Sequence, residues 1–199
     1  MLKCGGEHID TRERIVIKFR ELAEERGFYG ATVDELASRN NMSKRTIYRY
    51  FKSKEELIVA VMEHFMAEVE QEVLQVLDSS ENPVQKITLF VKLLSERLRE
   101  LSPGIYGDLQ RHYPLIWERV EQFRAEKLRY LIGIIVEGSQ QGYFKPINPT
   151  IVTASLLATA RAVVNPKFVL ENNLCIEDAF RTMMDTFLYG IVTEKHSVS

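Results

Sequence analysis

The chain has 199 residues, 45% of them hydrophobic, enough for one sizeable core or two small ones. Its longest apolar runs, such as residues 131–136, fall far short of the roughly 20 residues of a transmembrane helix, and residues 1–6 lack the apolar segment of a signal peptide, so we expect a cytoplasmic protein without a membrane partner. The net charge of −2 is unevenly divided, because residues 1–54 carry about 12 Lys and Arg against about 8 Asp and Glu, and the remainder carries about 14 against about 20. The basic first part can neutralise phosphate groups, while the acidic remainder stays away from a duplex.

A first helix is expected to begin near Asp10, because Asp10 and Glu13 form a capping signature. Beyond it, Ile15, Phe19 and Leu22 fall on one stripe of that helix. A stripe of this kind indicates a face that packs into a core, not a binding site.

Three further helix starts follow within a short stretch. Thr32 and Glu35 fit the capping box, in which each residue satisfies a backbone N–H near the other. Ser53 and Glu56 repeat that pattern, and Ser43 is a single-residue N-cap. Two short helices and the beginning of a third are therefore predicted.

The two short helices are predicted to pack together across a tight turn. Asn40 and Asn41 supply the residue type that most readily adopts a left-handed backbone there. Leu36 and Ile47 are spaced to pack between the helices. The polar side chains left pointing outward are Lys44, Arg45, Thr46, Tyr48 and Arg49. Such an arrangement describes a helix-turn-helix, whose second helix enters the DNA major groove.

This segment resembles the DNA-binding domain of the TetR family of transcriptional regulators. The resemblance covers roughly the first 60 residues, and residue types at fixed spacing over that span make it specific. The matching residues are Gly27, Phe28, Gly30, Thr32, Leu36, Ala37, Ser43, Thr46, Tyr48, Tyr50, Phe51, Lys54 and Leu57. Asn41 departs from the usual Gly, which Asn can tolerate, and Arg45 replaces a residue that is commonly small, which affects the operator sequence rather than the fold.

Helical geometry suggests roles for the polar residues. Arg45 and Arg49 share a face in the first two turns after Ser43, where a guanidinium can make a bidentate contact with guanine. Hydroxyl and ammonium groups suit phosphate oxygens, as the family resemblance implies for several positions, and Thr32 is a candidate phosphate contact although its capping role alone explains it. The expected DNA-contacting residues are Thr32, Lys44, Arg45, Thr46, Tyr48, Arg49, Tyr50 and Lys54.

The rest of the chain is also predicted to be helical. A long helix after Ser53 continues to Leu77, and further helices are expected near 83–101, 104–112, 115–141, 149–164 and 176–193, with no strand alternation. The fold class is therefore all-α. Residues 1–54 would form a three-helix helix-turn-helix DNA-binding domain, joined by the long helix to a helical-bundle domain for ligand binding and dimerisation within residues 55–199.

The last two helices are expected to join two copies of the chain. Residues 151–164 are almost wholly apolar with small side chains, and the final helix carries an apolar stripe wider than packing against its own chain requires. A four-helix contact in a homodimer would cover both, as the resemblance also implies, while an internal core helix in a monomer is the alternative. The expected interface residues are Ala154, Ala158, Ala162, Phe180, Met183, Met184, Phe187 and Ile191.

The resemblance implies a small-molecule effector held among the middle helices. Trp117 is expected near that site, because several aromatic residues gather around helix breaks, although core packing explains each wall residue equally well. The candidates are Phe65, Phe90, Leu94, Tyr106, Tyr113, Trp117, Phe123, Tyr130 and Arg161. Arg161 is the only charge in its helix, and a buried Arg needs a carboxylate, more often from the protein than from an acidic ligand.

No enzymatic site is expected. The histidines are scattered, and there is no nucleophile motif, metal-ligand spacing or glycine-rich phosphate loop, so we predict no catalytic residue, metal or cofactor.

The predicted function is a homodimeric transcriptional regulator that binds palindromic half-sites of a double-stranded operator in the major groove. Repression, implied by the resemblance alone, would end when an effector moves the two DNA-binding domains away from the roughly 34–36 Å spacing of successive grooves. The alternative is a DNA-bound interaction protein of the same fold that acts on chromosome or division machinery without an inducer. Genome-wide occupancy would separate the two hypotheses, since a local regulator occupies few promoters.

Overall fold

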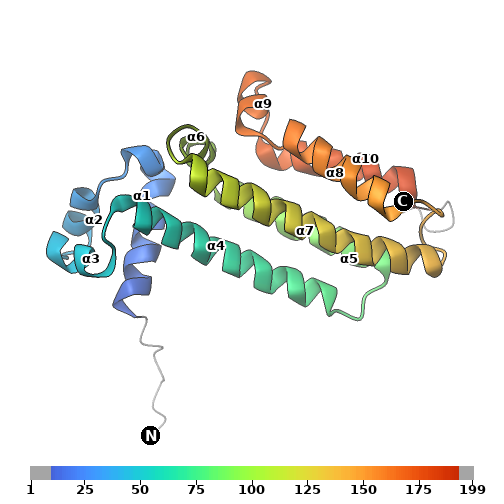
Figure 1. Ribbon diagram of the computed structural model, residues 1–199, viewed down its shortest axis with the longest axis horizontal. Helices are drawn as coiled ribbons and strands as arrows, with labels where there is room; N and C mark the ends of the chain where they lie inside the picture. Colours follow the sequence, from blue (N-terminus) through green and yellow to red (C-terminus); the bar gives the residue numbers. More distant parts are fainter. Residues whose placement is uncertain (1–9, 193–199) are drawn as a thin grey trace, which may run out of the picture. The chain divides into compact units, whose positions relative to one another are not determined.

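The structure is a computed structural model that describes residues 10–192, and in this part of the chain every regular element is an α-helix (Figure 1). The helices are α1 (Thr11–Gly30), α2 (Val33–Arg39), α3 (Lys44–Tyr50), α4 (Lys54–Leu77), α5 (Pro83–Glu100), α6 (Pro103–His112), α7 (Pro114–Gln140), α8 (Pro149–Val163), α9 (Pro166–Glu171) and α10 (Ile176–Ile191). The predicted all-α fold class is confirmed.

The chain divides into two compact units, and the division falls between Phe65 and Met66, inside α4. The first unit contains α1, α2, α3 and the first part of α4, and the second contains the remaining helices. The sequence predicts a boundary between residues 54 and 55, which is at the start of α4. The observed division lies further along the same helix. A continuous helix, not a loop, therefore runs from one unit into the other.

The first unit has a core that α1 organises. Ile15 and Phe19 are fully buried, and the ring of Phe19 stacks on that of Phe28 with centroids 6.2 Å apart. Gly27 interrupts α1 with a φ of 72°, in the left-handed region that glycine adopts readily. Asp10 occupies the N-cap position, but its side chain makes no capping bond, so the predicted capping signature of this helix is wrong.

The other three predicted helix starts are confirmed by hydrogen bonds from backbone N–H groups. The Thr32 hydroxyl accepts from Glu35 at 3.1 Å, the Ser43 hydroxyl from Thr46 at 3.0 Å, and the Ser53 hydroxyl from Glu56 at 3.1 Å. These bonds satisfy N–H groups that a helix leaves unpaired in its first turn.

The turn between α2 and α3 has one left-handed residue. Asn41 has a φ of 50°, as predicted, whereas Asn40 has a φ of −110° and serves as the C-cap of α2. The Asn40 side-chain amide donates to the Leu36 carbonyl at 2.9 Å, which satisfies an acceptor at the helix end. An Asn can therefore fill the position where glycine is common.

The second unit packs α5, α7, α8 and α10 against one another, and Figure 1 shows α8 and α10 side by side. The predicted helices are confirmed to within a few residues at each end. The sequence did not indicate α9, which has only 6 residues and is too short to show helical periodicity. Its signals are local, because Asn165 caps it and Pro166 begins it.

The end of α7 is anchored to α10 by a turn around Phe144. A Cβ atom on Gly138 would come within 2.3 Å of the buried Phe144 ring, so only glycine leaves room for it. Gly142 takes a φ of 81° in the turn, and the Lys145 N–H then donates to the Ile191 carbonyl at 2.8 Å. The turn thus fixes the C-terminal ends of two helices of the second unit together.

Candidate functional site

The exposed face of α3 carries most of the residues expected to contact DNA. Ile47 is only 1% exposed and attaches the helix to the core of the first unit. On the other side, Ser43, Arg45, Thr46, Tyr48 and Arg49 line one open hollow. The helix therefore separates a packing side from a polar side, as its sequence predicts.

Arg45 is the most available cation of this hollow. Its side chain is exposed and forms no hydrogen bond or ion pair with any residue between 10 and 192. An arginine offers five N–H donors in a planar fork, which matches the O6 and N7 acceptors of guanine. The fork of Arg45 can contact a ligand without first breaking an interaction within these residues.

Arg49 lies on the same face of α3 but is engaged with its neighbour. Its Nη2 donates to the Tyr50 hydroxyl at 3.3 Å, and its guanidinium carbon lies 5.1 Å from the centroid of that ring. Attraction between a guanidinium and an aromatic face holds the side chain in place. Arg49 and Tyr50 therefore form a linked pair at the edge of the hollow.

Two hydroxyl groups share a bond at the start of α3. Ser43 Oγ and Thr46 Oγ1 are 2.8 Å apart, and Ser43 Oγ also accepts from the Thr46 N–H. This double link positions Thr46 in the first turn, where backbone N–H groups point toward an approaching anion. Tyr48, which is 49% exposed, extends its phenol from the same helix.

The two lysines of the predicted set are held by partners within the first unit. Lys44 Nζ lies 2.6 Å from Asp34 Oδ1, and Lys54 Nζ donates to the Tyr29 carbonyl at 2.8 Å. The sequence did not reveal either partner, because nothing in local spacing links residues so far apart. Lys44 is already neutralised by Asp34, so its attraction for a phosphate is weaker than that of an unpaired lysine.

Comparison with known proteins points to one family. A family model described as "Bacterial regulatory proteins, tetR family" matches residues 20–61. The chain is 25% identical over 186 residues to the uncharacterised HTH-type transcriptional regulator YvaF of Bacillus subtilis, covering 93% of this chain and 97% of YvaF. It is 37% identical over 75 residues to the HTH-type transcriptional repressor NemR of Escherichia coli, covering 38% of this chain and 37% of NemR. Residues 20–61 therefore match the DNA-binding segment of the TetR family.

The fold is shared with solved structures over most of the chain. A proposed transcriptional regulator from Saccharomonospora viridis, solved in complex with choline, matches with a TM-score of 0.73 at 17% identity, covering 92% of this chain and 98% of that one. The proteins that the chain matches are helix-turn-helix transcriptional regulators, not enzymes. Within residues 10–192 no three His, Cys, Asp or Glu side chains are grouped to hold a metal ion, and no helix is long and apolar enough to span a membrane.

A pocket lies in the second unit, among α5, α7, α8 and α10. Of the predicted ligand-contacting residues it is lined by Leu94, Phe123 and Arg161. Its other lining residues are Leu98, Glu121, Arg124, Ala125, Lys127, Leu128, Leu157, Ala160 and Phe180. The sequence missed Glu121 and Arg124 as a pair, since spacing of three residues on a helix is typical of a solvated surface pair.

The remaining predicted ligand-contacting residues lie elsewhere. Phe65 belongs to the first unit, where the guanidinium of Arg20 lies 5.2 Å from its ring centroid, so it is not among the middle helices. Phe90 is fully buried in the core. The Tyr106 and Trp117 rings meet edge to face at 6.5 Å, outside the residues that line this pocket.

Two tyrosines of the same predicted set have other structural roles. Tyr113 is the C-cap of α6, and its backbone carbonyl accepts from the N–H of Trp117 in the first turn of α7. The Tyr130 hydroxyl donates to Glu70 at 2.9 Å. Neither residue lines the pocket.

The prediction that Arg161 is buried, and therefore needs a carboxylate partner, is wrong. The side chain is exposed, and its guanidinium forms no hydrogen bond or ion pair with another residue in 10–192. Its helix, α8, turns its buried side toward α7 and α10 through Leu156 and Ala160. Arg161 thus lies at the edge of the pocket rather than in the core.

The predicted dimer residues fall into two groups. Ala154, Ala158 and Ala162 are exposed on α8, and Phe187 is half-buried on α10. The other four residues are buried in the core of their own chain, each at most 8% exposed, so they are not on its surface: Phe180, Met183, Met184 and Ile191. The apolar stripe of α10 is broad because it serves this internal core as well as a surface.

A buried charge cluster joins α7 to α4 within the second unit. Lys127 is only 4% exposed, and its ammonium forms an ion pair with Glu70 and lies 4.6 Å and 4.8 Å from the ring centroids of Phe123 and Tyr130. Burial lowers the pKa of Lys127 from its ordinary value. On α6, the Tyr106 phenol is also buried, and desolvation raises its pKa to about 12.

Proposed function

We propose that this chain is a homodimeric repressor that binds an operator through two copies of α3 and leaves it when a small molecule binds the second unit. The observation that carries the DNA-binding part is the exposed, unengaged guanidinium of Arg45 beside Thr46, Tyr48 and Arg49 on one helix face. A helix with this polar face suits the major groove. The name of the relative NemR supports repression as the direction of control.

Arg45 would read base edges, because it alone among the α3 cations is exposed and uncommitted within residues 10–192. Arg49 would add a second base contact after its interaction with Tyr50 rearranges. Hydroxyl groups of Thr46, Tyr48 and Tyr50 suit phosphate oxygens, which fix position without reading sequence. The remaining members of the predicted set, Thr32, Lys44 and Lys54, would contribute to phosphate contacts.

Dimerisation is supported by apolar surface on α8 and α10. Ile151 on α8 is 65% exposed and Tyr189 on α10 is 78% exposed, and α8 also carries small exposed side chains. An apolar groove among α8, α9 and α10 is lined by residues such as Val163, Phe168 and Phe187. Contiguous apolar surface of this kind favours a partner, and a second copy would supply the second α3 that a palindromic site requires.

Release by a ligand would follow from differential binding to two conformations of the chain. Such a ligand binds more tightly to the conformation whose two α3 helices do not match the spacing of successive grooves. Operator affinity falls by the difference in the ligand's binding free energy between the two conformations, typically about 1–3 kcal/mol, or about 5- to 150-fold. The S. viridis protein of the same fold holds choline, which supports the capacity of such a helical body to take up a small molecule.

Selection of bound duplexes from a random pool would test the proposal directly. The expected product is a pair of inverted half-sites whose centres are one helical turn, about 34–36 Å, or a multiple of it apart. Sedimentation of the complex should then show two chains for each duplex. Enrichment of no sequence, or of a single unrepeated half-site bound by one chain, would contradict a homodimeric operator-binding repressor.

A further inference from the structure

The pocket among α5, α7, α8 and α10 has a wall that suits an alkyl chain. Leu94 and Leu98 line it from α5, Leu128 from α7, Leu157 from α8 and Phe180 from α10. The space, counted with its open mouth and the solvent in it, is about 560 Å³. A ligand here would gain most of its affinity from apolar contact.

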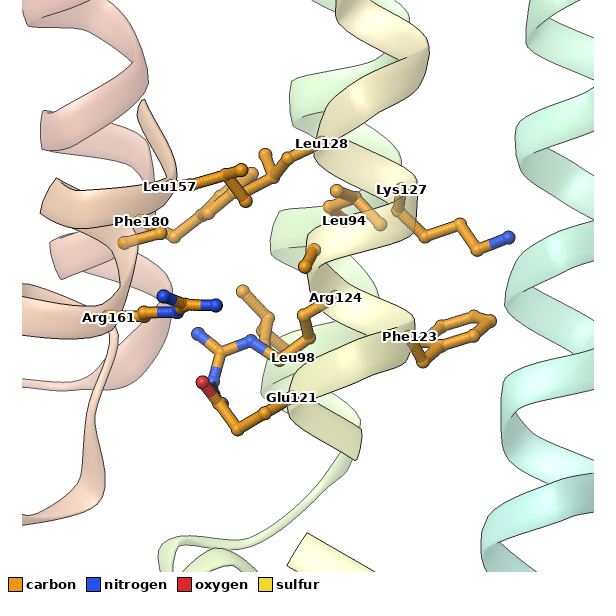
Figure 2. A pocket seen from close by; sticks show the side chains of 12 residues that line it. Leu94, Leu98, Glu121, Phe123, Arg124, Lys127, Leu128, Leu157, Arg161 and Phe180 are labelled. Atoms are coloured by element: carbon orange, nitrogen blue, oxygen red, sulfur yellow. Dashed lines mark hydrogen bonds and ion pairs between the residues drawn. The ribbon is translucent and has the colours of Figure 1, made fainter. Parts of the chain in front are cut away.

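Of the cations that line the pocket, Arg124 and Arg161 lie together at one edge, and Lys127 points away. Figure 2 shows the Phe123 and Lys127 side chains pointing toward α4, away from the leucines, and Lys127 is paired with Glu70. Figure 2 also shows the guanidinium groups of Arg124 and Arg161 extending toward each other from α7 and α8. An occupant therefore meets guanidinium groups at one end and hydrocarbon along the rest.

Only one of the two guanidinium charges is uncompensated within residues 10–192. Arg124 Nη1 donates to Glu121 at 2.6 Å, and Arg124 Nη2 donates to the Val164 carbonyl at 2.7 Å. Arg161, by contrast, forms no ion pair or side-chain hydrogen bond with these residues. The charge left to balance is therefore a single positive one, which a monoanion matches.

We propose that this pocket binds a small amphipathic monocarboxylate, with its alkyl chain against the leucines and its carboxylate paired to Arg161. A guanidinium fork and a carboxylate can form two parallel hydrogen bonds, which an alcohol of the same length cannot. Arg124 holds the adjacent edge through Glu121 and the end of α8. The regulatory consequence of this ligand class rests on the proposed release of DNA. Binding of the ligand to the pocket does not depend on it and is measured separately.

Calorimetric titration of the full-length chain with octanoate and with octan-1-ol tests the assignment. The charged hydrogen bonds predict that octanoate binds at least about tenfold more tightly than octan-1-ol, at the low end for charged pairs because Arg161 is exposed. Arg161→Gln should abolish this preference while leaving octan-1-ol binding unchanged. Arg129→Gln, an exposed control on α7 outside the pocket, should keep it.

A second variant tests the location. Leu157→Trp fills the apolar wall and should weaken both probes together, whereas Arg161→Gln affects only the anion. Because Arg161 is exposed, its variant should unfold at the wild-type temperature, which circular dichroism checks. Undetectable octanoate binding, equal affinity for the two probes, or an undiminished preference in Arg161→Gln would each overturn the ligand class.

Operator binding in the presence of octanoate separates this inference from the proposed function. If octanoate binds through Arg161 and the selected duplex stays bound, the ligand class stands and release by such a ligand is refuted. If octanoate fails to bind while the chain still selects inverted half-sites, the ligand class is refuted and operator recognition stands.

Discussion

Replacing Arg45 by Ala tests whether this side chain reads bases. Because Arg45 is exposed and makes no bond within residues 10–192, contact with guanine breaks no interaction among them. A bidentate arginine–guanine contact contributes about 1–3 kcal/mol of discrimination, so Arg45→Ala should weaken binding to the selected duplex about 5- to 150-fold. Binding to a scrambled duplex should fall much less, and preference at particular base pairs should relax.

Arg49→Ala should have a smaller effect, because Arg49 must leave Tyr50 before it reaches a base. The guanidinium lies 5.1 Å from the Tyr50 ring centroid. An exposed cation–π interaction contributes about 0.5–1 kcal/mol, and subtracting it from the range of about 1–3 kcal/mol leaves about 0–2.5 kcal/mol for Arg49. The structure therefore orders the two variants, with the larger loss of discrimination in Arg45→Ala.

Fluorescence anisotropy with the selected and scrambled duplexes, at several salt concentrations, measures the affinity of each variant and its discrimination between the two duplexes. Arg45→Lys keeps the charge without the fork, so it should keep general affinity and the salt slope but lose discrimination. Arg26→Ala, whose guanidinium lies 3.6 Å from Glu35 and outside the hollow, is the matched control. An unchanged ratio of affinities in Arg45→Ala would refute the reasoning.

Three further predictions concern the second unit. Ala158→Glu should place a charge in the proposed dimer contact and split the dimer without unfolding the chain, as seen by sedimentation, whereas Lys92→Glu on the exposed side of α5 should not. Lys127→Met should lower the free energy of unfolding, measured by urea denaturation, by about 3 kcal/mol. This is the low end for breaking a buried pair, because the Glu70 side chain is 32% exposed. Adding Glu70→Gln should recover part of the loss. Since the Tyr106 pKa is raised from 10.0 to about 12 in the folded chain, its stabilising contribution is complete below pH 10.0 and is lost as pH rises through about 12, and Tyr106→Phe should flatten this alkaline decline in thermal unfolding scans.

Much of the first unit could be predicted because its signals are local. The hydroxyls of Thr32, Ser43 and Ser53 cap the helices that follow them, and Asn41 takes the left-handed turn. These features depend on residues a few positions apart, so the sequence displays them directly. Asp10 is the exception, because residue type alone does not ensure that its carboxylate turns toward the helix start.

The arrangement of the pocket could not be predicted in the same way. Arg124 bonds to the carbonyl of Val164, and Lys127 pairs with Glu70, in both cases across distant segments of the chain. Periodicity assigns a residue to a face of its helix, but it does not say which helix covers that face. Aromatic content led to Trp117, whereas the observed pocket wall is rich in leucine.

The division of the chain inside α4 determines how the protein can be dissected. Leu57, Ile58, Val61 and Met62 are each at most 1% exposed, and they belong to the first unit although they lie on the long helix. A fragment ending at residue 54 would discard these side chains, each contributing about 1.5–3 kcal/mol when fully buried, which together rivals the whole stability of a small domain. A recombinant DNA-binding fragment therefore has to extend at least through Phe65, with a few more helical turns to protect its new end from fraying.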